Sequence, residues 1–419
     1  MGHRSPNRSP RATPAEGATA APAFGKLSRV GRNVVALGLT SLLTDVSSEM
    51  VTAILPLYLT FVLRFSPLQF GFFDGLYQGV TALVRIGSAV RADRRRQYKG
   101  VAALGYGTSA LCKLGLLAAG TAWLPTTAIL VVDRLGKGVR TAPRDALIAL
   151  SSVRAHVAEA FGVHRAMDTA GALIGPLLAF AVLSTAPAAY DAVFAVSFAA
   201  GVAGLGALLL LVENRSGSAV SERRPAVRLR GVIALLQIPQ FRRLVFVGGL
   251  LSLVTVSDAF VYLVCQRRAN LDPGVFPLLP VAVALAYLLL AIPAGRLADR
   301  IGRARVLLGG YAALAAVYAL LAWPVADAPV ILSSLPLLGT YYAATDGVLM
   351  ALASRALPAP LLTSGLALLT TVTVLVRLVA STTFGAVWSW RGPQQAVLLF
   401  LIGLVGALSV SAVALRERR

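Results

Sequence analysis

The sequence is short of charged residues and of the residues that bind metals or form disulfides. Only 14% of its 419 residues are charged, and it has two cysteines and three histidines. Cys112 and Cys265 both lie within apolar runs. We therefore expect buried small hydrophobic side chains at these positions, and neither a disulfide framework nor a metal site.

The sequence also lacks the motifs of nucleotide-driven enzymes and acyltransferases. It has no glycine-rich phosphate loop ending in Lys-Ser or Lys-Thr. The pair His164 and Asp168 is one residue short of an acyltransferase His-x-x-x-x-Asp pattern. We expect no enzyme activity and no cofactor, so the energy for any transport must come from an ion gradient or from the substrate's own gradient.

Hydrophobic residues, by contrast, make up 57% of the chain. Apolar runs recur from end to end, and a run of about 20 such residues crosses a ~30 Å hydrocarbon core as a helix. Lipid offers no partner for an unpaired backbone amide, so helices are the expected form. The first run is too long for a signal peptide and lacks a small-residue cleavage site. We predict twelve spans, near 34–63, 68–90, 100–120, 125–149, 157–183, 190–212, 241–265, 275–297, 304–323, 329–353, 361–387 and 393–415.

The placement of the residues behind the net charge of +21 indicates how the chain is oriented in the membrane. Arginine and lysine gather in alternate loops, such as "RADRRRQYKG" (91–100) and "RSGSAVSERRPAVRLRG" (215–231), whereas the intervening loops hold few. Positive residues favour the cytoplasmic side, so we expect both termini inside the cell and no nucleic-acid partner. The expected partners are the lipid bilayer, protons and a small-molecule substrate. We expect a monomer that spans a prokaryotic inner or plasma membrane.

A polar gap at 213–240 separates six predicted spans from six. "AVRADRRRQYKG" (89–100) and "GRLADRIGRARV" (295–306) occupy matching places on the two sides of this gap. Two related six-helix halves are the usual build of a secondary transporter, with the substrate site between them. We predict an all-α membrane protein with a disordered basic tail at 1–32, six-helix bundles related by pseudo-symmetry at 33–212 and 241–415, a cytoplasmic linker at 213–240 and a tail at 416–419.

These repeated loops resemble the signature of the major facilitator superfamily. "GRLADRIGRAR" is close to the loop that follows the second span of each half in that family, and the first copy is degenerate. The resemblance implies that the two loops help to lock the cytoplasmic side shut. The implied gating residues are Asp93 and Arg94 in the first copy and Gly295, Asp299, Arg300, Gly302 and Arg303 in the second.

The fourth predicted span carries a charged helix face. Asp133, Lys137, Arg140 and Arg144 are spaced 4, 3 and 4 residues apart, with Arg134 on the adjacent stripe. Charge near the bilayer centre is costly against lipid, so this face must look into protein or a water-filled cavity. Arg134-x-x-Lys137-Gly resembles the family's fourth-helix motif, whose arginine takes part in proton transfer in proton-coupled members. Lys137 stands where the family usually has glutamine.

The fifth predicted span contains "GALIGP" (171–176), which resembles the family's antiporter signature. Gly171 and Gly175 allow close helix approach, and Pro176 bends the span. Asp168 lies on the same 4, 3, 4 face. Ordinary packing of small residues is the alternative interpretation of the glycines.

Other spans add polar groups to the expected cavity. Asp45 and Glu49 are four residues apart, and two carboxylates in a low dielectric do not easily both ionise, which suits reversible protonation. The alternative is a packing ion pair with Lys137 or Arg134. The remaining candidates are Asp74, Arg85, Asp258, Tyr262, Tyr342, Asp346 and Arg377.

We expect a secondary transporter that works by alternating access, most simply a proton-coupled exporter of a small organic molecule. The alternative is a proton-coupled uptake symporter, or a facilitator, for an organic anion or another small solute. Deep cations favour anionic cargo, but they balance the acids nearly one for one and then leave the cargo's charge open. The sequence assigns no role to Lys113.

Overall fold

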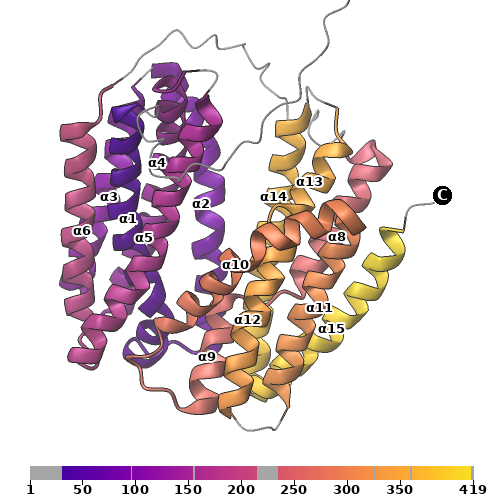
Figure 1. The fold of residues 1–419 in the computed structure, drawn as a ribbon. Helices are drawn as coiled ribbons and strands as arrows, with labels where there is room; N and C mark the ends of the chain where they lie inside the picture. Colours follow the sequence, from indigo (N-terminus) through magenta and orange to yellow (C-terminus); the bar gives the residue numbers. More distant parts are fainter. Residues whose placement is uncertain are drawn as a thin grey trace, which may run out of the picture.

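The computed structural model describes residues 31–95, 97–153, 156–214, 235–323, 327–358 and 361–416. Within these ranges the side chains of 82–83, 85–95, 158, 327 and 363–364 lie outside the description. The described chain is all-helical and contains no β-strand. Its helices stand side by side in two groups, one on each side of the molecule (Figure 1).

The first group holds the helices before residue 212, and its long helices match the first six predicted spans within a few residues at most ends. α1 packs against α5 and α6, and α4 packs against α2 and α3. These elements are α1 (Arg32–Leu57) with a short π-helix, η2 (Tyr58–Val62), then α2 (Pro67–Arg95), α3 (Tyr98–Ala119), α4 (Trp123–Leu150), α5 (Val157–Thr185) and α6 (Tyr190–Leu211).

The second group holds the helices after residue 235, and two of its predicted spans are each broken in two. α12 packs against α10 and α11, and α14 packs against α8 and α15. The elements are η4 (Leu235–Gln237), α8 (Pro239–Leu253), α9 (Asp258–Ala269), α10 (Leu278–Ile301), α11 (Arg303–Ala322), α12 (Asp327–Thr345), α13 (Val348–Arg355), α14 (Leu362–Arg391) and α15 (Pro393–Ala414).

The span predicted near 241–265 is present, as Pro239–Ala269, but its helix is broken. α8 ends at Leu253 and α9 begins at Asp258, with an irregular stretch between them. The break is tolerated because a tyrosine of α11 satisfies the freed backbone groups: the Val256 amide donates to the Tyr318 hydroxyl (2.7 Å), which donates to the Val254 carbonyl (3.4 Å). The break places Asp258 in the first turn of α9.

The helix at the span predicted near 329–353 is also broken in two. α12 ends at Thr345 and α13 begins at Val348. Between them Gly347 has φ +74°, in the left-handed region that favours glycine. The Asp346-Gly347 pair is a typical turn dipeptide, so this break had a signal in the sequence.

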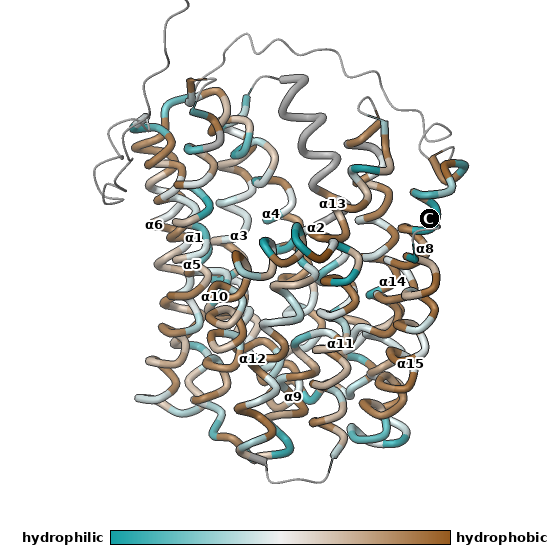
Figure 2. Tube along the Cα trace, turned by 45° about the vertical axis from the view of Figure 1, so that its right-hand side comes forward, coloured by the Kyte–Doolittle hydropathy of each residue, from teal (hydrophilic) through white to brown (hydrophobic). Residues whose placement is uncertain are grey.

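Nine helical segments of the described chain are long and apolar enough to cross a membrane. Twelve spans were predicted, and the three that miss this criterion are α2, α4 and the broken pair α12–α13. α4 contains six charged residues and α2 ends in a charged run, so both are too polar to qualify alone. Figure 2 shows hydrophobic residues along most of the other helices.

The two groups meet along a seam between α2 and α14. A Cβ atom added at Gly71 would lie 2.3 Å from the Ser381 carbonyl oxygen, and one added at Gly385 would lie 2.2 Å from the Pro67 carbonyl oxygen. Beside this seam, the Phe260 ring packs on Phe70 at a centroid distance of 4.9 Å. The seam lies at the end of the molecule opposite to the end of α6 and the start of α8 (Figure 1).

Candidate functional site

Three adjoining cavities, of about 230, 320 and 380 Å³, are lined by both groups of helices, and a fourth, of about 560 Å³, is lined by the first group. They are connected through shared lining residues. Glu49 lines three of them and Asp258 lines three. A space between two helix groups that is lined by both is the expected place for a transporter's substrate.

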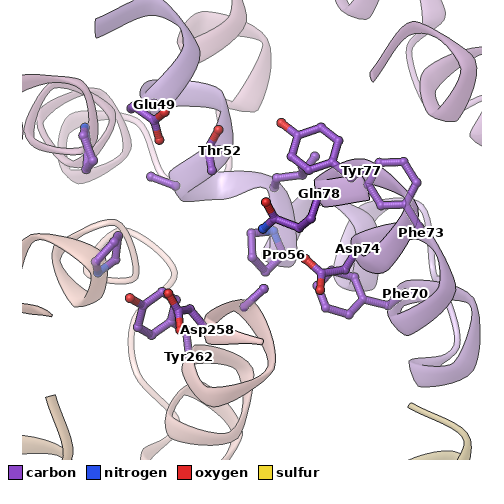
Figure 3. Close-up of a pocket in the computed structure, with 15 residues that line it drawn as sticks. Glu49, Thr52, Pro56, Phe70, Phe73, Asp74, Tyr77, Gln78, Asp258 and Tyr262 are labelled. Carbon is purple, nitrogen blue, oxygen red and sulfur yellow. The ribbon is translucent and has the colours of Figure 1, made fainter. Parts of the chain in front are cut away.

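The cavity of about 230 Å³, which we call the aromatic pocket, combines rings with acids. Its lining includes Phe70, Phe73, Tyr77 and Tyr262. Figure 3 shows Glu49 and Thr52 from α1, Asp74 and Gln78 from α2, and Asp258 and Tyr262 from α9 around one space. A mostly apolar pocket with a few convergent polar groups is typical of a small-molecule site.

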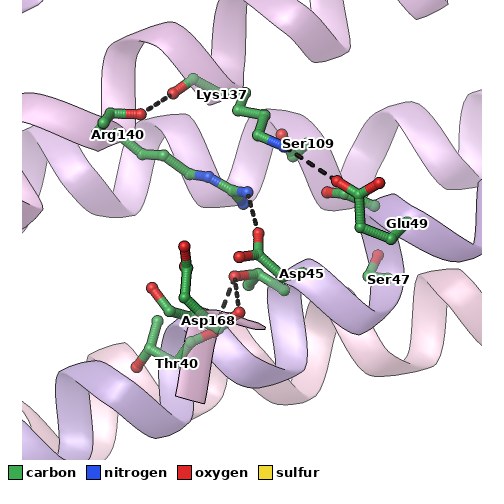
Figure 4. Close-up of polar contacts among 12 residues, drawn as sticks. Thr40, Asp45, Ser47, Glu49, Ser109, Lys137, Arg140 and Asp168 are labelled. Carbon is green, nitrogen blue, oxygen red and sulfur yellow. Dashed lines mark hydrogen bonds and ion pairs between the residues drawn. The ribbon is translucent and has the colours of Figure 1, made fainter. Parts of the chain in front are cut away.

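The cavity of about 560 Å³, which we call the charged chamber, is lined mainly by α1, α4 and α5. Lys137 Nζ lies 3.2 Å from Glu49 Oε1, and Arg140 Nη2 lies 3.3 Å from Asp45 Oδ1 (Figure 4). Within the charged chamber these two cations and two acids therefore neutralise one another.

Arg144 holds a third group of acids in the charged chamber. Its guanidinium lies 3.0 Å from Asp145 and 3.5 Å from Asp168, and it donates to the Ser41 hydroxyl at 3.1 Å. The Ser41 hydroxyl also lies 2.9 Å from His164 Nε2. The end of this chamber is thus an ionic network that joins α1, α4 and α5.

The ion pairs differ in their exposure to the cavity. The side chains of Glu49 and Lys137 are 25% and 29% exposed, whereas those of Asp45 and Arg140 are 11% and 2% exposed. Glu49 also lines both the aromatic pocket and the charged chamber. Glu49 is therefore a partly exposed carboxylate of this network that lies open to both cavities.

Arg134 is buried and contacts a tyrosine instead of an acid. Its Nη2 donates to the Tyr77 hydroxyl and, at 3.0 Å, to the Thr52 hydroxyl. Its guanidinium carbon lies 3.9 Å from the centre of the Tyr77 ring, a cation–π distance. Its Nε has no hydrogen-bond partner among the residues that the structure describes. Arg134 thus supports a wall of the aromatic pocket from behind.

The structure assigns Lys113 to an ion pair with Asp133. The Lys113 Nζ contacts Asp133 Oδ1 between α3 and α4, and both side chains are almost wholly buried. Asp133 therefore serves to compensate a lysine in the protein interior. The sequence signal was present in retrospect, because a lysine within a span needs an acid on a neighbouring helix.

Asp74 of α2 and two acids of the second group of helices, Asp258 and Asp346, bind hydroxyl groups, whereas Arg377 has no ion-pair partner among the described residues. Tyr342 donates to Asp258 at 2.5 Å, Ser381 donates to Asp74 at 2.9 Å, and Tyr287 donates to Asp346 at 3.3 Å. Arg377 lines the cavity of about 380 Å³ with Asp74 and Asp258. It is exposed there and makes no hydrogen bond or ion pair with the described residues. The predicted residue Arg85 has its side chain outside the described residues.

The glycines of the fifth-helix motif allow α5 to pack directly against the backbone of α1. A Cβ atom added at Gly171 would lie 2.5 Å from the Leu42 carbonyl oxygen, and one added at Gly175 would lie 2.8 Å from the Val46 carbonyl oxygen. The next residue, Pro176, lines the aromatic pocket. The glycines therefore bring a cavity-lining helix against the helix that carries Asp45 and Glu49.

The structure describes the side chains of the second predicted gating loop but not those of the first. The side chains of Asp93 and Arg94 lie outside the described residues. In the second loop, Asp299 is 71% exposed and lies 3.5 Å from Arg303, which donates to the Ala351 carbonyl of α13 at 3.1 Å. Gly302 has φ +101° and ends α10.

Sequence reasoning missed the uncharged partners of the site, which are Tyr77, Thr52, Ser381, Tyr287 and the Tyr106 ring beneath Arg140. One of these had a usable signal. Phe70, Asp74 and Gln78 are spaced four residues apart on α2, and Tyr77 lies beside them, so a stripe of rings and polar groups was visible.

Residues 37–381 match the sequence model of the family described as the Major Facilitator Superfamily. It is 31% identical over 288 residues to an uncharacterized transporter of the same type from Methanocaldococcus jannaschii, a match that covers 67% of this chain and 70% of that protein. An uncharacterized protein of Mycobacterium tuberculosis is 31% identical over 199 residues, covering 45% of this chain and 48% of that protein.

Solved transporter structures share the fold at low sequence identity. A variant of a nucleoside transporter superposes with a TM-score of 0.79 at 13% identity, covering 91% of this chain and 100% of that one. A POT family transporter bound to 5-aminolevulinic acid superposes with a TM-score of 0.72 at 13% identity, covering 91% and 96%. A human organic anion transporter superposes at 0.60 with 15% identity, covering 91% and 99%.

Proposed function

The chain belongs to the major facilitator superfamily of membrane transporters, and from this premise we propose that it exports a small organic molecule in exchange for protons. The observation that carries the proposal is the position of Glu49. This carboxylate is partly exposed, is paired with Lys137, and lines both the aromatic pocket and the charged chamber. Cargo in the pocket and a proton arriving through the chamber would meet at one group.

The exchange follows from the charge balance around Glu49. When Glu49 is ionised, Lys137 is compensated at 3.2 Å. When Glu49 takes a proton, Lys137 loses its partner, and an uncompensated charge in a low-dielectric cavity is costly. The protonated and ionised states therefore favour different arrangements of α1 and α4, and this difference supplies the coupling that alternating access requires.

We further propose that residues 33–212 and 241–415 are two six-helix halves related by pseudo-symmetry, with both termini in the cytoplasm. The bias of arginine and lysine toward alternate loops supports this orientation. Cysteines introduced at Ser218 and Ala326 should react from opposite faces, with Ser218 labelled only from the cytoplasm. Labelling of both by an impermeant reagent added outside intact cells would contradict this topology.

Arg377 favours a second candidate, proton-coupled uptake of an organic anion. It is an exposed cavity cation without a partner among the described residues. A carboxylate or phosphate on the cargo would supply the missing partner, and Asp74 and Asp258 beside it would accept protons that travel in the same direction.

Proton flux in proteoliposomes separates the two candidates. Compounds are first found by screening overexpressing and deletion strains for resistance and for retained metabolites. Each hit is then added outside vesicles that contain a pH-sensitive dye. Exchange alkalinises the lumen as cargo enters, whereas co-transport acidifies it. Transport with no proton movement would exclude both proton-coupled candidates.

A further inference from the structure

A separate cavity of about 680 Å³ lies within the second half, away from the chain of cavities between the halves. It is formed where α10 turns into α11, with α13 and the end of α15 completing the wall. The site residues proposed above contribute only Asp299, Gly302 and Arg303 to its lining.

The charge of this cavity is one-sided. Arg303, Arg305, Arg355 and Arg416 line it, against the single carboxylate of Asp299. Asp299 lies 3.5 Å from Arg303, so one arginine is compensated. Arg305 donates to the Ile301 carbonyl at 3.1 Å, which satisfies a donor but leaves its charge.

Two of the arginines have no partner at all in the described part of the chain. Arg355, in the last turn of α13, and Arg416, just beyond α15, are both exposed, and their side chains make no hydrogen bond or ion pair with described residues. Guanidinium groups from different elements that converge on one cavity are suited to an oxyanion with several acceptor oxygens, such as a phosphate.

The floor of the cavity is apolar. Leu308, Leu352 and Leu415 line it, and Ile301, also in its lining, is 43% exposed on the outer surface. Val413 on α15 is 69% exposed beside this end of the helix. A soluble anion would not use this apolar wall, whereas the glycerol and upper acyl carbons of a lipid would cover it.

We propose that this cavity binds the phosphodiester group of an anionic phospholipid, with Arg355 and Arg416 as its principal contacts. The arginines take the phosphate oxygens, and the leucine floor takes the apolar part of the lipid. The cavity lies at the end of the molecule that we place in the cytoplasm, where the leaflet carries anionic lipid.

The test is native mass spectrometry of the purified full-length protein titrated with phosphatidylglycerol, phosphatidylcholine or sodium phosphate. The cavity variant is Arg355→Gln/Arg416→Gln. The matched control is Arg242→Gln/Arg243→Gln, which removes two exposed arginines from the start of α8, outside this cavity. We expect the cavity variant to lose one bound phosphatidylglycerol and to weaken its apparent affinity by about tenfold or more, the scale set by charge-assisted hydrogen bonds.

The control variant should bind phosphatidylglycerol as the wild type does, and both proteins should bind phosphatidylcholine more weakly than phosphatidylglycerol. A conservative variant, Arg355→Lys/Arg416→Lys, retains the charge and should retain the lipid, which guards against loss of binding through misfolding. Equal loss in the control variant, or binding of sodium phosphate that displaces the lipid from wild type, would overturn the proposal.

Discussion

Two ion pairs of α4 differ in how far water reaches them. The side chains of Lys113 and Asp133 are 2% and 8% exposed, whereas those of Lys137 and Glu49 are 29% and 25% exposed. A pair sealed from water holds helices together, because neither partner can change its charge without leaving the other uncompensated. A pair that water reaches can exchange a proton, so the two pairs should respond differently to the same kind of mutation.

The sealed pair should affect stability. Lys113→Met should lower the free energy of unfolding by about 3–5 kcal/mol, because Asp133 is left buried without a partner. The double variant Lys113→Met/Asp133→Leu should recover most of that loss. Lys99→Met, which removes a half-buried lysine of the same helix whose ammonium donates to the Leu209 carbonyl at 2.9 Å, should cost no more than about 1 kcal/mol, because no buried acid is left without a partner. Denaturant unfolding in detergent measures all three, and equal losses in the single and double variants would contradict the pairing.

The exposed pair should affect coupling. Glu49→Gln should reduce transport driven by a pH gradient by about 5- to 150-fold, the range of ordinary coupling energies. Counterflow of cargo down its own gradient should persist, since it needs no net proton movement. Glu159→Gln, which changes an acid in the first turn of α5, should leave both rates unchanged. If Glu49→Gln kept its response to the pH gradient, another acid would carry the proton.

At the scale of elements, glycine decides where helices touch. α5 contains both a glycine pressed on a neighbour and a glycine facing open space. A Cβ atom at Gly171 would lie 2.5 Å from a carbonyl oxygen of α1, whereas one at Gly162 would meet nothing within 4 Å. The same substitution at these two positions should therefore change stability in opposite directions.

Gly171→Ala should destabilise the protein by about 1–3 kcal/mol, the usual cost of overpacking, because backbone must move to admit the methyl group. Gly162→Ala should instead stabilise it by about 0.5–1 kcal/mol, through the helix propensity of alanine. Thermal unfolding in detergent compares the two. Equal effects would mean that α5 does not pack on α1 in this way.

The sequence predicted the helices well where hydrophobic length alone decides them. It failed at 254–257 and at 346–347, where the helices break. The first break depends on Tyr318, whose hydroxyl lies close to Val254 and Val256 only once α11 has packed, so local sequence could not show it. The acids of the candidate site were visible from their i, i+4 spacing, but their partners were not, since Ser381 is 307 residues away from Asp74 in the chain.

For the molecule as a whole, the seam between α2 and α14 keeps one end shut. Gly71 and Gly385 let the two backbones meet, and the Leu68 amide donates to the Ser389 hydroxyl at 3.1 Å. In the described structure the charged chamber extends from the middle of the molecule toward the other end, reaching Arg144 and Arg165. The proposed alternating access would require this seam to part.

Gly71→Ala should weaken the seam and increase the population of molecules that are open at this end. Spin labels on Gln69 and Trp390, with both native cysteines replaced by serine, report the separation by electron–electron resonance. We expect the long-distance population to increase by about 5-fold or more, which corresponds to a shift of about 1 kcal/mol or more. Gly79→Ala on the same helix, where the nearest side chain lies at an ordinary 3.7 Å, should leave the distribution unchanged. An unchanged distribution in Gly71→Ala would show that the seam does not control this end.

The charges of α4 also have a consequence for the way the chain enters the bilayer during synthesis. Each charge at the centre of a lone helix costs about 2.5–3.5 kcal/mol on insertion, so α4 is a poor substrate for insertion by itself. Its partners Asp45 and Glu49 in α1 and Lys113 in α3 are synthesised before it. The order of helices along the chain is then also an order of assembly. α1 and α3, which carry the two acids and the lysine, enter the membrane first, and α4 then inserts and forms its ion pairs with them.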